Sequence, residues 1–140
     1  MRARLQPLKI AGVTLRYLEL GAGEPLMLLH GYPQSHLCWQ FHAKELAKTH
    51  RVVAPDWFGW GESERSLAIK PEYSAEVDRI GLLADALKLD RFNLAGHDYG
   101  GFLALGFALR APSRVLRFAI LNSRAHRSFT AAFYRQTALQ

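Results

Sequence analysis

The sequence contains a single cysteine, Cys38, among its 140 residues. One cysteine excludes an internal disulfide framework and fits a reducing compartment, so we predict a cytoplasmic protein. Its longest apolar runs are about the length of one strand, far short of the roughly 20 residues that a membrane-spanning helix needs. The charged N-terminus lacks an apolar stretch, so we expect neither a signal peptide nor a membrane partner.

Acidic residues are absent from the last part of the chain. No Asp or Glu follows Asp98, and His126 is the one histidine beyond it. The net charge of +6 comes entirely from six arginines within residues 99–140. These arginines are dispersed and no aromatic stacking motif accompanies them, so we expect solvated positions and no nucleic-acid partner.

The composition indicates one globular domain, with 49% hydrophobic and 21% charged residues. No His, Cys or carboxylate spacing is typical of a metal site. Gly21 and Gly23 lack the third glycine of a dinucleotide fingerprint, and a strand follows them. The sequence therefore predicts no metal and no cofactor.

Predicted strands and helices alternate along the chain. Apolar patterns predict strands at residues 8–10, 13–20, 26–29, 51–55, 92–95 and 115–121. Helices are predicted at residues 36–49, 73–89 and 102–110, the first of them capped by Ser35. This order predicts an α/β, three-layer fold: a mostly parallel sheet of about six strands with helices on both faces.

Polar and glycine-rich loops follow four of the predicted strands, and they begin at His30, Asp56, His97 and Asn122. Ligands of such sheets bind at the carboxyl ends of the strands. We therefore expect these four loops to meet at one edge of the sheet.

One loop carries the pattern Gly96-His97-Asp98-Tyr99-Gly100 between a predicted strand and a predicted helix. Gly-x-nucleophile-x-Gly at this position is the pattern of a nucleophile elbow, a turn so tight that small flanking residues are needed. The usual residue at the apex is Ser, and here it is Asp98. A structural role for Asp98 is the alternative, since Asp tolerates strained turns.

Three motifs in this order resemble the first part of an α/β-hydrolase, over about residues 8–125. They are His30-Gly31-Tyr32-Pro33, Asp56-x-x-Gly59-x-Gly61-x-Ser63, and the elbow. Asp at the elbow is similar to the branch of epoxide hydrolases, haloalkane dehalogenases and fluoroacetate dehalogenases. Haloalkane dehalogenases usually carry Asn where this chain has Tyr32, and fluoroacetate dehalogenases carry Arg where it has Tyr99. The resemblance therefore implies epoxide hydrolysis first, with haloalkane or haloacetate dehalogenation as the alternative.

The resemblance also implies a mechanism. A carboxylate is ionised at neutral pH, so Asp98 would attack a saturated carbon of a small apolar organic substrate and form an alkyl ester. Water would then cleave the ester, while the backbone N–H groups of Tyr32 and Tyr99 hold the oxyanion. The family usually has a cis bond at Tyr32–Pro33. Support for the loop and elbow is assigned to His30, Gly31, Pro33, Gly96, His97 and Gly100.

Two aromatic residues, Trp57 and Phe58, are expected either to line an apolar pocket or to pack beneath a cap. Asp56 is expected to secure its own loop. In the family, the base His arrives after an eighth strand and a helical cap follows the sixth. The resemblance thus implies an N-terminal part of the core domain at residues 1–125 and the start of a cap or helical tail at 126–140. Such a fragment lacks the base, and we expect His126 to lie on the surface.

A chain without the last two strands of the family would expose the edge of its sixth strand. It would therefore form a homodimer through that edge, or persist as an inactive remnant or an interaction module. This is the alternative from a different functional class.

Overall fold

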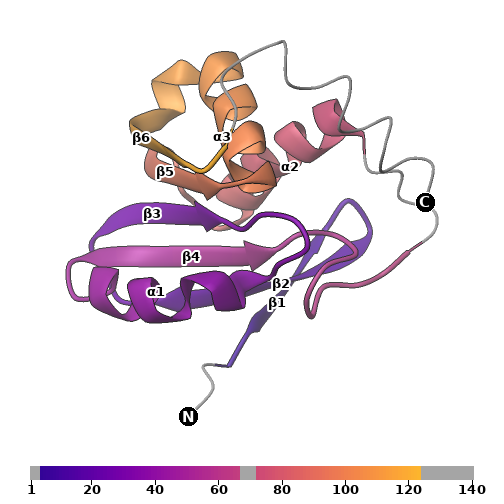
Figure 1. Cartoon of the computed structure of the whole chain (residues 1–140), viewed down its shortest axis with the longest axis horizontal. Helices are drawn as coiled ribbons and strands as arrows, with labels where there is room; N and C mark the ends of the chain where they lie inside the picture. Colours follow the sequence, from indigo (N-terminus) through magenta and orange to yellow (C-terminus); the bar gives the residue numbers. More distant parts are fainter. Residues whose placement is uncertain (1–3, 67–71, 124–140) are drawn as a thin grey trace.

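The computed structural model describes residues 4–66 and 72–123. In these ranges one sheet has the strand order β1-β2-β4-β3-β5-β6 (Figure 1). The strands are β1 (Gln6–Ile10), β2 (Val13–Leu20), β3 (Glu24–Leu29), β4 (His50–Asp56), β5 (Phe92–His97) and β6 (Val115–Leu121). The helices are η1 (His36–Trp39), α1 (Gln40–Leu46), α2 (Tyr73–Ala86), α3 (Tyr99–Arg110) and η2 (Pro112–Arg114).

The sheet is mostly parallel. Strand β3 pairs in parallel with β4 and with β5, and β5 pairs in parallel with β6. The first two strands are antiparallel: β1 pairs with β2, and β2 with β4. The predicted sheet of about six strands is confirmed, and the carboxyl ends of β4, β3, β5 and β6 share one edge.

Helices cover both faces of the sheet, which confirms the predicted layers (Figure 1). On one face, residues of α2 and α3 pack with Met27 and Leu29 of β3. On the other face, η1 and α1 pack with Leu26 and Leu28 of the same strand. The continuous apolar run of β3 is therefore buried on both sides, as expected for a central strand.

All three predicted helices differ from their bounds, and the first and second end at Leu46 and Ala86, three residues earlier than predicted. The helix predicted from residue 36 begins with four residues of 3-10 helix, because the N–H of Cys38 bonds back to Ser35 and Asp56 binds His36. Helix α3 begins at Tyr99, three residues earlier than predicted, because the elbow leads straight into it. The Ser35 cap is confirmed by its hydrogen bond from the N–H of Leu37.

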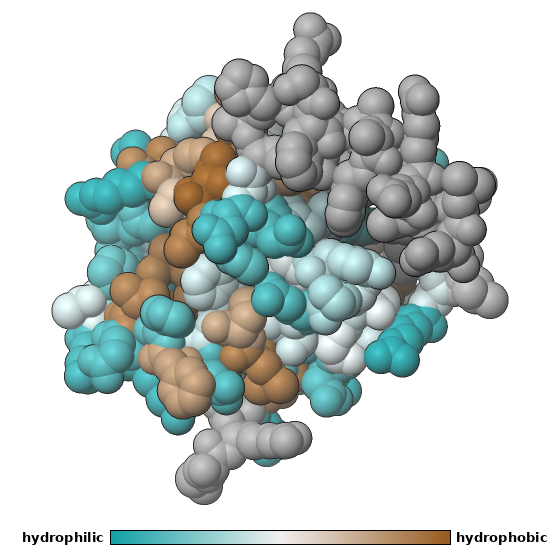
Figure 2. Space-filling model, in the orientation of Figure 1, coloured by the Kyte–Doolittle hydropathy of each residue, from teal (hydrophilic) through white to brown (hydrophobic). Residues whose placement is uncertain are grey.

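Strand β6 lies at an edge of the described sheet. Its side chains Phe118 and Leu121 are 38% and 42% exposed. Figure 2 shows brown, apolar surface over the region where Figure 1 draws β5 and β6. The dimer predicted through this edge stays a prediction.

The predicted helical tail from about residue 128 and the predicted domain boundary at 125/126 lie outside the described residues. None of the helices within the described ranges combines the length and apolarity that a bilayer crossing requires.

Candidate active site

Asp98 stands at the apex of the turn between β5 and α3. Its backbone has φ +53° and ψ −119°, a conformation that non-glycine residues rarely adopt. The flanking glycines are required by space: a Cβ on Gly96 would collide with the backbone of Gly100, and one on Gly100 with the carbonyl of Leu29. The turn therefore has the geometry of an elbow, and it presents a half-buried carboxylate.

The loop after β3 meets this carboxylate. The backbone N–H of Tyr32 donates to Oδ1 of Asp98 at 2.8 Å. A Cβ on Gly31 would lie 2.5 Å from Cβ of Asp98 and 2.8 Å from its Oδ1, so only glycine permits this approach. The Tyr32–Pro33 peptide bond is cis, as the resemblance implied. Side-chain packing adds an edge-to-face contact between Tyr32 and Trp60 at 5.1 Å.

The direction of the Tyr32 N–H is fixed from the other side of its peptide unit. The carbonyl oxygen of Gly31 accepts hydrogen bonds from Nδ1 of His30 at 2.9 Å and from the N–H of Gln34 at 3.0 Å. A peptide unit is planar, with its C=O and N–H pointing in opposite directions. Holding the Gly31 oxygen therefore turns the Tyr32 N–H toward Asp98.

His30 is a neutral, fully bonded histidine. It is 1% exposed, and its Nε2 accepts the backbone N–H of Trp57 at 3.2 Å. Its Nδ1 must then carry the proton that it donates to Gly31. Burial lowers the pKa of His30 below its usual value. Both ring nitrogens are thus engaged, and the expected supporting role of His30 agrees with these contacts.

Asp56, at the end of β4, ties down the glycine-rich loop that follows. Its carboxylate accepts hydrogen bonds from the backbone N–H of His36 at 2.6 Å, from the backbone N–H of Glu62 at 2.9 Å and from Nδ1 of the His36 ring at 2.9 Å. Burial raises the pKa of this carboxyl, but the hydrogen bonds from His36 and Glu62 outweigh burial and hold the pKa below its usual value. The carbonyl of Asp56 also accepts the hydroxyl of Ser63 at 2.6 Å. The expectation that Asp56 secures its loop is confirmed.

Trp57 and Phe58 belong to the hydrophobic core, where they are 1% and 7% exposed. The guanidinium of Arg79 lies 4.7 Å above the ring of Phe58. Of the two expectations, packing agrees better with this burial, because a pocket wall needs accessible surface. Their role as pocket-lining residues stays a prediction.

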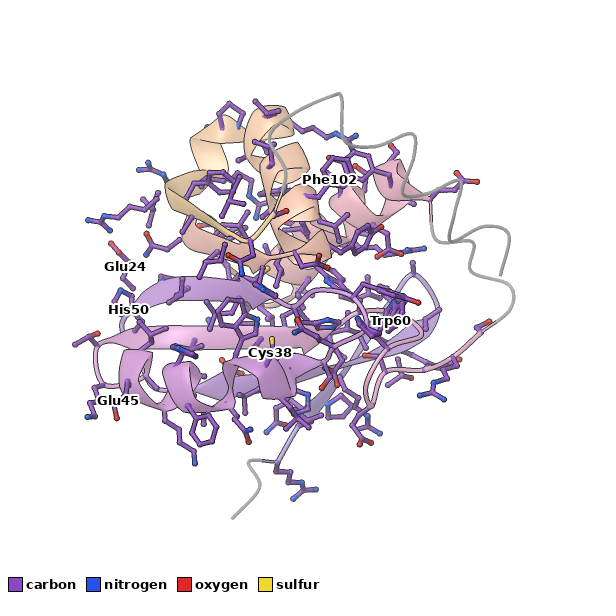
Figure 3. All side chains as sticks on the ribbon, viewed as in Figure 1. Glu24, Cys38, Glu45, His50, Trp60 and Phe102 are labelled. Carbon is purple, nitrogen blue, oxygen red and sulfur yellow. The ribbon has the colours of Figure 1, made fainter. Side chains whose placement is uncertain are left out.

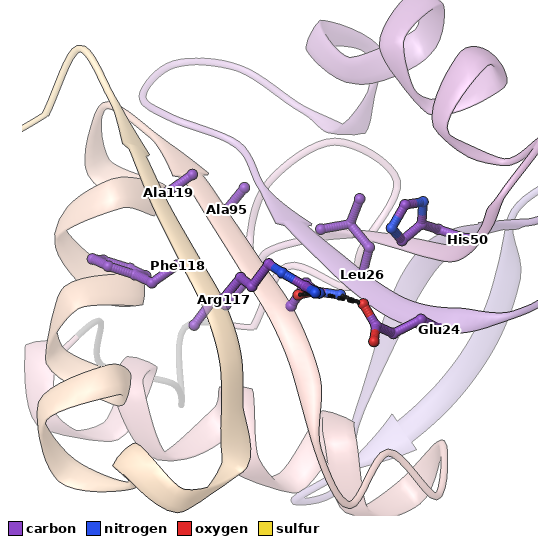
Figure 4. Close-up of a pocket in the computed structure, with 9 residues that line it drawn as sticks. Glu24, Leu26, His50, Ala95, Arg117, Phe118 and Ala119 are labelled. Carbon is purple, nitrogen blue, oxygen red and sulfur yellow. Dashed lines mark hydrogen bonds and ion pairs between the residues drawn. The ribbon is translucent and has the colours of Figure 1, made fainter.

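A hollow of about 440 Å³ in the described structure lies away from Asp98. It is lined by residues near the amino ends of the strands, among them Glu24, His50, Asn93 and Arg117 (Figure 4). There the guanidinium of Arg117 and the amide of Asn93 each donate to Glu24 at 2.7 Å. Figure 3 shows Glu24 and His50 at one end of the strands and Trp60 toward the other. This hollow is therefore not the site around Asp98.

The predicted meeting of the four loops is confirmed by hydrogen bonds between them. Tyr32 binds Asp98, His30 binds Trp57, and the N–H of Asp98 donates to the carbonyl of Leu121 at the end of β6. The hydroxyl of Ser123, beyond β6, donates to the carbonyl of Asp98. Tyr99 opens α3 beside them, at the helix end that carries partial positive charge.

Two contributing residues were given no role in the site from the sequence. Ser123 secures the elbow from β6, and Oε1 of Gln34 lies between the Gly31 loop and His97. Gln34 follows directly on the His30–Pro33 motif of the resemblance, but neither residue type indicates a role in the site by itself. His97 was expected to support the elbow, and its hydrogen bond with Gln34 links the elbow to the Gly31 loop, 63 positions away in the sequence.

The chain belongs to the α/β-hydrolase fold family, whose family model matches residues 24–139. It is 37% identical over 116 residues to the 2-hydroxymuconate semialdehyde hydrolase of Pseudomonas sp. strain CF600, a match covering 81% of this chain and 41% of that enzyme. It is 36% identical over 113 residues to the soluble epoxide hydrolase of Corynebacterium sp. strain C12, covering 81% and 39%. These relatives are hydrolases, and the chain spans about two fifths of their length.

A solved structure also matches this chain. It is one of the epoxide hydrolases found in metagenomes from hot environments, and it superposes with a TM-score of 0.78 at 32% identity. The superposition covers 88% of this chain and 43% of that one. The expected resemblance to the first part of an α/β-hydrolase is confirmed.

Proposed function

We propose that the chain carries the nucleophile of an epoxide-hydrolase-type reaction, with Asp98 attacking a saturated carbon. The observation that supports this most directly is the carboxylate at the apex of a strained elbow with the Tyr32 N–H on its Oδ1. A carboxylate attacking an acyl carbon would give a reactive mixed anhydride, whereas attack on a saturated carbon gives a stable ester. The soluble epoxide hydrolase among the relatives supports the same choice.

The proposed first step needs only water as a proton donor. Oδ2 of Asp98 attacks an epoxide carbon, the carbon–oxygen bond of the ring breaks, and the released alkoxide takes a proton from water, which leaves hydroxide in the solvent. The product is a hydroxyalkyl ester. Oδ1 becomes the ester carbonyl and remains beside the Tyr32 N–H, where negative charge would develop during hydrolysis. The N–H of Tyr99 is the proposed second donor.

The second step needs a general base that activates water. His30 cannot serve, because both of its ring nitrogens are already bonded. No acid follows Asp98 in the sequence to orient His126. We therefore propose that the 140-residue chain forms the ester once and stops there, whereas a complete enzyme of this type would turn over.

Intact-mass measurement tests this proposal. The chain is incubated with styrene oxide, a small apolar epoxide, in parallel with 1-bromobutane and chloroacetate as probes of dehalogenation. We expect one styrene oxide per chain and none on the Asp98→Asn variant. Equal labelling of that variant would contradict the nucleophile, steady diol release by the wild type would contradict the single turnover, and preferential reaction with a halide would favour the dehalogenase alternative.

The edge of β6 supports a second proposal, that the chain self-associates. Phe118 and Leu121 expose apolar surface there, next to strand backbone with no neighbour in the described sheet. Light scattering over a concentration series should show a dimer that Phe118→Lys dissociates. A monomer at all concentrations would contradict this second proposal and leave the chemistry at Asp98 untouched.

A further inference from the structure

We propose that Gln34 is a positioning residue that joins the two halves of the site through one oxygen atom. Its Oε1 lies 3.2 Å from the backbone nitrogen of Gly31 and 3.1 Å from Nδ1 of His97. Gly31 immediately precedes the proposed oxyanion donor Tyr32, and His97 immediately precedes Asp98. The inference deepens the proposed function of Asp98 and rests on it.

The hydrogen-bonding chemistry determines which atoms face one another. A backbone N–H only donates, so Gln34 must turn its carbonyl oxygen toward Gly31, and not its amide nitrogen. The same oxygen faces Nδ1 of His97, and it can only accept, so Nδ1 carries the proton. The two lone pairs of Oε1 thus bind donors from two segments 63 residues apart in the sequence.

Gln34 also holds the peptide that aims the donor. Its backbone N–H donates to the carbonyl of Gly31 at 3.0 Å while its side chain accepts from the N–H of Gly31. Gly31 is therefore fixed on both sides by one residue. Since the Gly31–Tyr32 peptide is planar, its orientation sets the direction of the Tyr32 N–H toward Asp98.

Loss of the side-chain oxygen would leave the backbone turn closed but would release its link to the elbow. The Tyr32 N–H would then spend less time aligned with Asp98. The Tyr32 N–H holds the Asp98 carboxylate in the orientation from which Oδ2 would attack, and small misplacements of a reacting group are costly, so we expect ester formation to slow about 10- to 100-fold. Gln34 and His97 are both half-buried, so the fold should tolerate the change.

The test compares three variants. Gln34→Met is nearly isosteric and lacks the acceptor, Gln34→Glu restores an acceptor oxygen, and Gln40→Met makes the same change at an exposed position of α1. One readout is the rate of Asp98 ester formation at saturating styrene oxide, together with the half-saturating concentration. The other is hydrogen exchange of the Tyr32 amide by NMR, which needs no reaction.

Gln34→Met should slow ester formation at saturation by about 10- to 100-fold with little change in half-saturation, because Asp98 is less well positioned, and should speed exchange of the Tyr32 amide. Gln34→Glu and Gln40→Met should stay close to wild type in both readouts. An unchanged rate and exchange in Gln34→Met would overturn the inference, as would a slow variant that Gln34→Glu fails to rescue.

The experiments can contradict the proposed function of Asp98 and the positioning role of Gln34 independently of each other. If the wild type forms no ester, the proposed function is contradicted, and hydrogen exchange of the Tyr32 amide still tests the role of Gln34. If the ester forms equally fast in every variant, the function stands and the inference fails. Should Gln34→Met not fold, His97→Phe removes the other end of the link and must speed Tyr32 exchange in the same way.

Discussion

The backbone N–H of Tyr32 donates a 2.8 Å hydrogen bond to Oδ1 of Asp98, across 66 positions of the sequence. This contact joins the loop after β3 to the elbow after β5. In the proposed reaction, Oδ2 would then be the attacking oxygen, and the Tyr32 N–H would lie beside the carbonyl of the ester. The proposed chemistry at Asp98 depends on this arrangement.

Replacing Gly31 by Ala should disturb the arrangement directly. The added Cβ would lie 2.8 Å from Oδ1 of Asp98 and 2.5 Å from its Cβ, so the carboxylate must move off the Tyr32 N–H. We expect ester formation by Gly31→Ala to slow about 100-fold, because the attacking carboxylate is no longer held in place. The rate of adduct formation by intact mass checks this.

Gly81→Ala is the matched control for that change. Gly81 lies in α2, and its added Cβ would meet only Phe107, at an ordinary 3.4 Å. Alanine favours a helix interior by up to about 1 kcal/mol over glycine, so this variant should unfold at slightly higher denaturant and react at the wild-type rate. Equal rates in both variants would show that contact with Asp98 does not matter.

The neutral state of His30 predicts a pH dependence of stability. Burial lowers the folded-state pKa of His30 below the ordinary 6.5, so the unfolded chain binds a proton that the folded chain rejects. The contribution of His30 to the free energy of unfolding is complete above pH 6.5. It is lost as the pH falls from 6.5 to the lower folded-state pKa, by at most about 1.4 kcal/mol per pH unit.

Urea unfolding between pH 8 and pH 5 checks this prediction. His30→Asn keeps a donor for the Gly31 carbonyl and cannot titrate, so its free energy of unfolding should fall less steeply with acid. The other histidines contribute to both proteins alike. Parallel curves for wild type and variant would contradict the assignment of His30 as a buried neutral group.

Asp56→Asn should destabilise the fold strongly. The carboxylate is fully buried and accepts three hydrogen bonds, and an amide in its place can accept on one atom only. Breaking a buried charged contact costs about 3–5 kcal/mol, which urea unfolding at pH 7 would register. The pKa of Asp56 is lowered below the ordinary 3.8, so its contribution is complete at pH 7 and is lost only as the pH falls through the lowered value.

Asp85→Asn provides the comparison for Asp56. Asp85 pairs with Arg114 at 2.7 Å at the surface, where its side chain is 62% exposed. Such pairs contribute less than about 1 kcal/mol. A similar loss of stability in both variants would mean that the Asp56 hydrogen bonds do not secure the loop after β4.

Cys38 should be unreactive in the folded chain. Burial, together with the charge of Asp56, raises the pKa of its thiol to about 11. Thiolate is the reactive form, so iodoacetamide at pH 8 should label Cys38 slowly until urea unfolds the chain. Rapid labelling of the native chain would contradict this burial and would also make Cys38 a competing target for epoxides.

The sequence predicted the sheet well because apolar runs such as residues 26–29 and 52–54 mark strands that are buried in the fold. The apex at Asp98 was predictable for a similar reason, since two glycines around one polar residue mark a turn of this kind. The expected bounds of the helix after the elbow were wrong by three residues, because a turn that feeds directly into a helix leaves no separate signal.

Other parts of the site depend on contacts between distant segments. The hydrogen bonds of Gln34 with His97 and of Ser123 with Asp98 join residues whose types are common in any loop. The burial of Trp57 also depends on which helices pack against the loop after β4, and its aromatic character alone fits either a core or a pocket wall. Such features require the three-dimensional arrangement.

The most direct test of the central claim is peptide mapping of the chain after reaction with styrene oxide. We predict an ester on the peptide that contains Asp98, absent from Asp98→Asn, and no adduct on the peptide that contains Cys38. An adduct at any other residue, or an unmodified Asp98 after prolonged incubation of the folded chain, would contradict its assignment as the nucleophile.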